Sequence, residues 1–304
     1  MRRLVVGLVV LAFLGGAAFW LLTIPRSIDA ASLGARAADF GNGRTMFHAG
    51  GCAECHATPN QDNKDLMGGG LALKSPFGTF HVPNISPHPA DGIGAWTEAA
   101  FVTALVKGTS PDGRHYYPSL PYTSYQRMDI GDVRDLFAYI KTLPPVQGGR
   151  RGHELRFPFN IRRGVGLWKL LDLDGEPFRP DPAKPESWNR GAYLVTGPAH
   201  CGECHTPRNL IGGPIKSLAF AGGPNPDGEG WIPNITQKPL KDWSENNFSE
   251  LLDTGRTENG ESVSGAMAEV VKNTARLSPQ DRAAMATYLK SLPALDGPVR
   301  PRPN

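Results

Sequence analysis

Two short motifs hold the residues best suited to chemistry. Residues 52–56 read C-A-E-C-H and residues 201–205 read C-G-E-C-H, and together they contain all four cysteines among 304 residues. C-x-x-C-H is the attachment signature of c-type haem, because two thiols one helical turn apart can add to the porphyrin vinyl groups while the adjacent histidine binds the iron. The sequence therefore predicts two covalently attached haem c groups. Their predicted anchors are Cys52, Cys55, Cys201 and Cys204, and their predicted iron ligands include His56 and His205.

Other uses of paired cysteines explain the motifs less well. A C-x-x-C pair can also form a redox-active dithiol or half of a zinc site. Here each pair is followed directly by a histidine, and the two motifs occupy equivalent places in a repeated sequence. Because haem attachment accounts for all four cysteines, the sequence predicts no disulfide.

A second iron ligand, usually methionine or another histidine, is expected on the far side of each haem. Met267, in "SVSGAMAEVV", is expected in a loop ahead of the last helix, where it could reach the second iron. The matching position of the first repeat holds no methionine. Met128 is the preferred ligand there, with His115 and Met67 as alternatives, together with an open site.

The chain contains a tandem repeat in which residues 43–144 align with residues 191–293. "VPNIS" matches "IPNIT", "WTEAAFVTALVKGT" matches "WSENNFSELLDTGR", and "DVRDLFAYIKTLP" matches "DRAAMATYLKSLP", in the same order and with small gaps. Such internal similarity indicates a duplicated structural unit. Two residues recur in both copies, the asparagine of P-N-I (Asn84 and Asn234) and a tryptophan that follows it (Trp96 and Trp243). Their recurrence suggests a shared role such as forming a wall of the haem site.

Each repeat is predicted to consist of a few helices joined by long loops. Apolar residues four apart mark the buried face of one helix in each copy. A threonine or serine should begin that helix and a glycine should end it; these caps are Thr97 with Gly108, and Ser244 with Gly255. The last helix of each copy is predicted to start at Asp129 or at Ser278-Pro279, with proline in the first turn.

The N-terminus carries an apolar run from Leu4 to Ile24, preceded by two arginines. The run is long enough to span a bilayer, and Arg2 and Arg3 favour an N-terminus on the inner side. A cleaved signal peptide usually has a shorter apolar core and a small-x-small cleavage site. An uncleaved signal anchor over residues 1–30 is therefore preferred, and either interpretation predicts that the rest of the chain is exported.

The repeat also sets the expected domain boundaries. Haem domains are predicted over residues 38–145 and 188–295, an Arg/Pro-rich connector over 146–187, and a polar tail over 296–304. The proline density of residues 146–187 predicts that the connector is extended. Its arginines could bind a partner or acidic lipid headgroups, although a solvated linker explains them equally well; they are Arg150, Arg151, Arg156, Arg162 and Arg163. The formal net charge of +3 is too small to suggest a nucleic acid partner.

These residues resemble the multihaem cytochrome c subunits of membrane-bound bacterial dehydrogenases, of the alcohol, gluconate and fructose dehydrogenase type. The resemblance covers most of the chain after the apolar run and is most specific over residues 167–209 and 82–128. It implies a mainly α fold of two tandem class I cytochrome c domains, each wrapping one covalent haem, behind an N-terminal transmembrane helix. The methionine ligand of the family's final domain corresponds to Met267.

The resemblance also implies a function. Electrons would pass from a dehydrogenase catalytic subunit of flavin or molybdenum type to an acceptor such as quinone, a terminal oxidase or a soluble cytochrome c. The expected protein is a membrane-tethered dihaem cytochrome c of the bacterial inner membrane, with its haem domains in the periplasm, and it is not an enzyme. The alternative is a dihaem enzyme of the peroxidase or thiosulfate dehydrogenase type.

Two departures from the family pattern bear on these expectations. The resembling subunits usually hold three haems and a C-terminal membrane-binding segment, whereas this chain has two motifs and ends in "DGPVRPRPN". Many of them read "YPAMPY" in the first domain, where this chain reads "YPSLPY". The quinone-reducing role and the first distal ligand are the inferences that these departures weaken.

Overall fold

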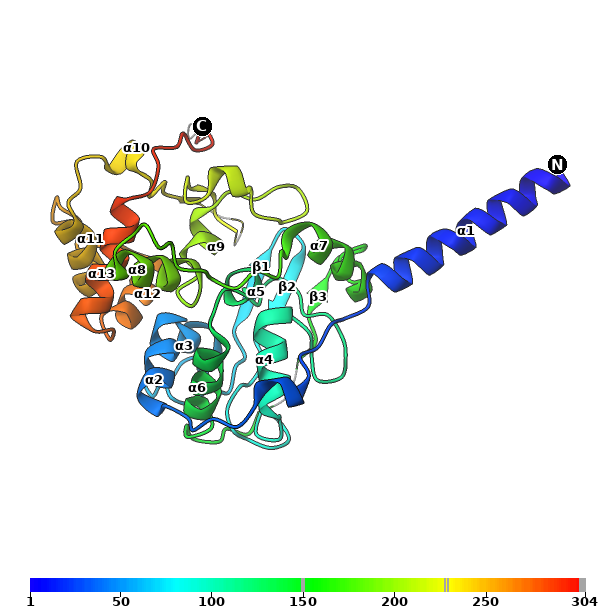
Figure 1. Cartoon of the computed structure of the whole chain (residues 1–304), viewed down its shortest axis with the longest axis horizontal. Coiled ribbons are helices and arrows are strands. Elements are labelled where there is room, and N and C mark those ends of the chain that lie inside the picture. Colours follow the sequence, from blue (N-terminus) through cyan, green and yellow to red (C-terminus); the bar gives the residue numbers. More distant parts are fainter. Residues whose placement is uncertain (149–150, 227, 229, 301–304) are drawn as a thin grey trace.

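An isolated N-terminal helix precedes two helical domains (Figure 1). The computed structural model describes residues 1–148, 151–226, 228 and 230–300, so the predicted Arg150 and the end of the polar tail lie outside the described residues. Helix α1 (Arg2–Leu22) has no buried residue and projects away from the domains (Figure 1). Of the described helices, it is the one whose length and composition suit a membrane crossing.

Each haem domain is built on a close crossing of its first and last helices. Helix α2 (Phe40–Ala49) packs on α6 (Ile130–Ile140), and α8 (Glu186–Thr196) packs on α13 (Pro279–Lys290). A glycine stands at each crossing. A Cβ atom at Gly43 would lie 2.1 Å from the Asp135 carbonyl oxygen, and one at Gly191 would lie 1.9 Å from that of Ala284. Only glycine lets the two backbones approach this closely.

The predicted helix ends are confirmed. Helix α4 (Glu98–Lys107) begins where the Thr97 hydroxyl accepts from the Ala100 amide and ends at Gly108 with φ 58°. Helix α11 (Glu245–Thr254) begins at the Ser244 cap and ends at Gly255 with φ 74°. Both glycines adopt the left-handed backbone that other residues rarely take. Helices α6 and α13 begin after Asp129 and Ser278, as expected.

The proline density of the connector predicted an extended chain, but the connector between the domains is not extended throughout. Residues 165–172 contain no proline and form helix α7 (Val165–Asp172). The connector also packs on the first domain. Strand β3 (Glu154–Leu155) joins β2 (Gly78–His81), which pairs with β1 (Ala72–Ser75) in an antiparallel sheet. The motif analysis did not predict these strands, because each is only two to four residues long.

The segment before α13 also differs from its prediction. Met267 was expected in a loop but lies in helix α12 (Ala266–Thr274), which packs against α2 of the first domain. The remaining helices are short: α3 (Cys52–His56), α5 (Tyr122–Tyr125), α9 (Cys201–His205), α10 (Gln237–Leu240), η1 (Ala30–Leu33), η2 (Arg162–Gly164) and η3 (Lys216–Leu218). Strands β4 (Gly223–Pro224) and β5 (Trp231–Ile232) form a second small sheet.

Candidate haem centres

Both C-x-x-C-H motifs form a single helical turn. Helices α3 and α9 each follow a residue with left-handed backbone, Gly51 with φ 54° and His200 with φ 39°. This turn of the chain starts a new helix directly at the first cysteine. Because the two cysteines are three positions apart, one helical turn brings both thiols to the same face, with the histidine just beyond.

The two motif histidines have the same hydrogen bond. His56 Nδ1 lies 2.8 Å from the Pro83 carbonyl oxygen, and His205 Nδ1 lies 2.9 Å from that of Pro233. A carbonyl can only accept, so Nδ1 carries the proton and Nε2 is left with the lone pair that an iron needs. Burial lowers the pKa of both histidines, which favours the same neutral form.

The asparagine that follows each of these prolines holds the proline loop in place. Asn84 Nδ2 donates to the Val146 carbonyl at 2.7 Å, while its Oδ1 accepts from the Ser86 amide at 2.8 Å. Asn234 repeats this arrangement with the Leu295 carbonyl and the Thr236 amide, at 2.8 and 2.9 Å. The repeated P-N-I therefore fastens the proline loop to the chain beyond the last helix. The sequence showed the recurrence but not these bonds, whose acceptors lie 62 and 61 residues away.

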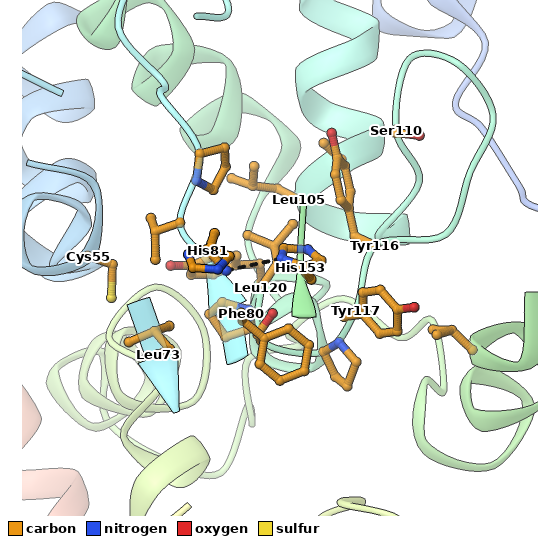
Figure 2. Close-up of a pocket in the computed structure, with 18 of the residues that line it drawn as sticks. Cys55, Leu73, Phe80, His81, Leu105, Ser110, Tyr116, Tyr117, Leu120 and His153 are labelled. Atoms are coloured by element: carbon orange, nitrogen blue, oxygen red, sulfur yellow. Dashed lines mark hydrogen bonds between the residues drawn. The ribbon is translucent and has the colours of Figure 1, made fainter. Parts of the chain in front are cut away.

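A large cavity of about 1500 Å³ opens beside the first motif. Cys52, Cys55 and His56 line it. Its other walls are mainly apolar and aromatic and include Trp96, Phe101, Leu105, Tyr116 and Tyr125. Figure 2 shows Leu105 and Tyr116 among them. Two thiols, a histidine with its Nε2 available and an apolar space of this size fit a covalently attached porphyrin. The recurrent Trp96 does form part of the wall, as suggested.

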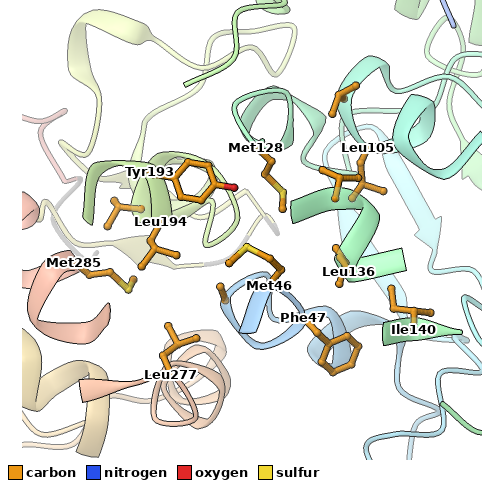
Figure 3. Close-up of a cluster of buried hydrophobic side chains, with 14 of the residues drawn as sticks. Met46, Phe47, Leu105, Met128, Leu136, Ile140, Tyr193, Leu194, Leu277 and Met285 are labelled. Atoms are coloured by element: carbon orange, nitrogen blue, oxygen red, sulfur yellow. The ribbon is translucent and has the colours of Figure 1, made fainter. Parts of the chain in front are cut away.

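Met128 lies on the wall of this cavity. Its side chain is 1% exposed and belongs to the buried cluster shown in Figure 3, together with Met46, which also lines the cavity. Among the described residues that line the cavity, neither His115 nor Met67 is found. His115 Nε2 instead lies 2.8 Å from the Thr23 carbonyl oxygen, at the end of α1. Of the predicted distal ligands, the structure thus brings Met128 to the cavity.

The second centre is less enclosed. His205 is buried, whereas Met267 is half-buried near the start of α12. Cys204 and the neighbouring Glu203 line the same cavity as the first motif. Trp243, the counterpart of Trp96, packs its ring on Phe248 at 5.2 Å. The structure therefore gives the second motif the same histidine geometry as the first, but a more open distal side.

Reciprocal contacts join each motif to the other domain, and the sequence did not predict them. Glu54, inside the first motif, accepts from Asn273 Nδ2 of the second domain at 2.9 Å. Glu203, inside the second motif, accepts from Thr123 and Ser124 of the first domain, the latter at 2.7 Å. Each acidic residue is the third residue of its motif. The sequence signal was the glutamate that occupies this position in both copies.

The electrostatic surroundings of the two glutamates differ. Burial raises the pKa of Glu54 to about 7. Burial also opposes ionisation of Glu203, but Arg208, at 2.6 Å, and the two hydroxyl groups outweigh it and lower the pKa of that carboxyl group. The contacts of Glu203 at the second motif therefore form a charged network. At the first motif, the raised pKa leaves the Glu54 carboxyl group only partly ionised near pH 7.

Comparison with known proteins places the fold and the two centres in one class, the c-type cytochromes. The cytochrome c family model matches residues 40–144 and 189–293, which are the two repeats. The chain therefore belongs to the cytochrome c family, once in each domain. It is an electron-transfer protein with two covalently bound haem c groups and is not a catalytic enzyme.

Several curated proteins are similar to this chain. A diheme cytochrome c-type protein of Cereibacter sphaeroides is 47% identical over 297 residues, covering 97% of this chain and 99% of that protein. The fructose dehydrogenase cytochrome subunit of Gluconobacter japonicus is 39% identical over 259 residues, and one subunit of the nicotinate dehydrogenase of Pseudomonas putida is 40% identical over 251 residues. The matches cover 83% and 82% of this chain but only 52% and 21% of those two proteins.

Proposed function

We propose that this protein is a membrane-tethered dihaem cytochrome c that relays single electrons from a dehydrogenase to a respiratory acceptor. In this proposal α1 spans the bacterial inner membrane and the haem domains lie in the periplasm. The exposed apolar α1 supports the tether. The relatives named as cytochrome subunits of fructose, alcohol and gluconate dehydrogenases support a dehydrogenase as the electron donor. The acceptor would be a terminal oxidase, a soluble cytochrome c or quinone.

The proposed haem attachment uses one motif per domain. Cys52 and Cys55 anchor the first haem, with His56 and Met128 as iron ligands. Cys201 and Cys204 anchor the second haem, with His205 and Met267 as ligands. When bound, haem supplies an iron centre that gains or loses one electron. The protein sets the balance between the reduced and the oxidised iron, because a neutral histidine, a thioether and an apolar wall all favour the less charged, reduced iron.

The observation that carries the proposal is the pair of reciprocal contacts by which each motif meets the other domain. Glu54 of the first motif and Glu203 of the second each accept hydrogen bonds from the opposite domain. His200, the residue before the second motif, adds a contact of 3.2 Å from its Nε2 to the Gly50 carbonyl oxygen. A protein that passes electrons between two haems needs them close and at a fixed separation. Contacts that join the two domains at their motifs support such an arrangement.

The test uses the full-length chain, matured with haem in bacterial membranes. Membrane vesicles would receive alcohol, fructose, gluconate or nicotinate in turn, and haem reduction would be followed optically. We expect at least one substrate to reduce both haems rapidly, and a terminal oxidase to reoxidise them. Haems that no dehydrogenase substrate reduces would contradict the relay. So would a high-spin haem that turns over peroxide or thiosulfate.

A further inference from the structure

The connector exposes a group of large apolar side chains close to the end of α1. This group, called here the connector patch, consists of Phe157, Phe159, Ile161, Leu167, Leu170 and Leu171. Their exposed fractions run from 39% at Phe159 to 78% at Phe157. Phe157 and Leu170 lie outside the cavity beside the first motif, whereas the other four also line it. Single exposed apolar residues are common on protein surfaces, but six within fifteen residues of chain indicate a surface that something covers.

Helix α7 has its apolar face turned outward. Its three leucines, at positions 167, 170 and 171, follow the spacing of one helical face, and all three are exposed. The residues on its other face are buried, and besides the apolar Val165 and Trp168 they include the charged Lys169 and Asp172. A helix on a water-exposed surface normally shows the opposite arrangement, with charges outside and leucines inside. An outward apolar face suits a helix that lies in a lipid interface.

The structure fixes this helix to the end of the proposed membrane span. Arg163, just before α7, donates from Nη2 to the Trp20 carbonyl at 2.7 Å and from Nε to the Thr23 hydroxyl at 2.8 Å. Its guanidinium also covers the Trp20 ring, with 4.3 Å between its Cζ and the ring centroid. Figure 1 shows α7 beside the base of α1. The height of α1 in a membrane would therefore determine the height of α7.

Trp20 marks that height. Tryptophan at the end of a membrane span prefers the headgroup region, where its ring is partly in lipid and its N–H is in a polar layer. Trp20 is 62% exposed and lies two residues before the end of α1. Because Arg163 bridges Trp20 and α7, the leucines of α7 come to the same level. A lipid interface thus begins at the position where the connector patch is found.

The charges around the connector patch suit anionic lipid. Residues 155–171 contain Arg156, Arg162 and Arg163 but no aspartate or glutamate, and the lysine of this stretch, Lys169, is buried on the other face of α7. Arg156 is exposed within the patch, and Arg26, just after α1, is exposed as well. Arginines near the membrane surface attract anionic headgroups, while their aliphatic stems can remain among apolar side chains.

We propose that the connector patch inserts into the headgroup region of the membrane that α1 spans, so that the haem domains rest on the bilayer in one orientation. This inference rests on the proposed function, in which α1 is a membrane span. The occupant of the patch is the lipid surface itself, with anionic lipids preferred. Phe159 packs on Phe77 of the β1–β2 turn, with ring centroids 4.6 Å apart, which ties the patch to the first haem domain.

The experiment uses the full-length haem-loaded chain in nanodiscs of phosphatidylcholine with a minority of phosphatidylglycerol. A single cysteine is introduced for a nitroxide label, at Leu170 in the patch, at Leu11 in the middle of α1, or at Val299. Val299 is the matched control, because it is an apolar residue, 91% exposed, outside the patch. The measurement compares the accessibility of each label to dissolved oxygen with its accessibility to a water-soluble nickel complex.

We expect the Leu170→Cys label to be several-fold less accessible to the nickel complex than the Val299→Cys label, and to gain accessibility in pure phosphatidylcholine. Equal nickel accessibility at Leu170 and Val299, with the Leu11→Cys label protected, would overturn the docking and leave the tether intact. A nickel-accessible Leu11 label would instead overturn the tether. Protection of Leu170 in native membranes but not in nanodiscs would assign the patch to a protein partner and overturn lipid docking.

A second variant tests whether the leucine face causes the protection. The Leu170→Cys label would be placed in a chain that also carries Leu167→Gln and Leu171→Gln. Both leucines are exposed, so the fold should tolerate the changes. We expect the nickel accessibility of the label to rise towards that of the Val299 label. Haem content is measured in parallel, because both leucines also line the cavity beside the first motif. Continued protection of the label would contradict a role for the leucine face.

Discussion

In the first domain, the cavity beside His56 includes the fully buried Met128, whereas in the second domain Met267 is half-exposed on a short helix. On the other side of each motif the two domains agree closely. Each histidine meets a proline carbonyl, and an asparagine holds each proline loop. The two copies therefore share the groups that fix the histidine, and they differ in the burial of the methionine that we propose for the other side of each haem.

The connector adds to this difference. In the first domain, the end of α4 receives the buried Lys169, whose Nζ donates to the Lys107 and Gly108 carbonyls at 2.7 and 2.6 Å. In the second domain, the equivalent end of α11 at Gly255 faces Val263 and Val271. The first domain thus has an extra polar support from a segment that follows it in the chain.

The largest expected effect comes from removing the proposed distal ligands. Met128→Ala should lower the reduction potential of the first haem on the order of 0.2 V, because axial ligands control potentials over about 0.8 V and methionine raises them. Met267→Ala should do the same to the second haem. Each variant should also lose the Met–iron charge-transfer band of one oxidised haem, as measured by redox titration and far-red absorption.

Met46→Leu is the control, because Met46 also lines the cavity but is predicted to pack in the core. Its potentials should remain those of the parent protein. If Met128→Ala left both potentials unchanged, another group would ligate the first haem, and the difference between the two domains would be greater than we propose.

The close helix crossings should be similar in both domains. Gly43→Ala and Gly191→Ala should each lower the free energy of unfolding by about 3 kcal/mol, since the new methyl group would overlap a backbone carbonyl. Chemical denaturation of the haem-loaded protein measures this change. Gly164→Ala is a control, because a Cβ atom added there would have nothing within 4 Å. A tolerated Gly191→Ala would show that the second crossing is looser.

Lys169 should give the first domain a pH dependence that has no counterpart at the equivalent helix end of the second domain. Burial lowers the pKa of Lys169 to about 7 from its ordinary value of 10.5. Between these pH values the unfolded chain binds more protons than the folded one, so stability should rise with pH. The gain from pH 7 to pH 9 is expected to be about 2 kcal/mol in the free energy of unfolding.

Lys169→Met supplies the comparison for this effect. The variant should lose that part of the pH dependence while keeping a side chain of similar length in the buried site. Denaturant titrations at several pH values would measure both proteins. An unchanged slope in Lys169→Met would mean that another group titrates.

The smallest expected difference concerns the two asparagines. Asn84→Ala should lower the free energy of unfolding by about 2 kcal/mol, because it removes a buried side chain that makes two hydrogen bonds to the backbone. Asn234 is only half-buried, so Asn234→Ala should cost about 1 kcal/mol. The exposed Asn246 on α11 offers a control variant, Asn246→Ala, with little effect. Equal losses at Asn84 and Asn234 would show that burial does not separate the two sites.

Local spacing was enough to predict the motifs, the repeat and the helix caps. Cys52, His56, Thr97 and Gly108 each act through residues that lie within one or two turns, so the sequence displays the whole pattern. The bond from His56 to Pro83 was not predictable in this way, because it depends on a loop that closes across 27 residues. The contacts of Glu54 and Glu203 depend on how the two domains dock.

Helices α7 and α12 show a second limit of prediction from the sequence. Helix α7 has a clear apolar face in the sequence, but the pattern does not say whether that face points inward or outward. Only the burial of Lys169 and Asp172 reveals its direction. Helix α12 lies in a segment that the alignment of the repeats treated as a loop, since its counterpart in the first copy is a different length of chain.

The contacts at Glu54 and Glu203 also constrain the order of assembly. Each glutamate belongs to the motif that must receive a haem, and each is covered by a residue of the other domain. The machinery that joins a porphyrin to Cys52 and Cys55 needs access to that same stretch of chain. We therefore expect haem attachment to come before the two domains close on each other.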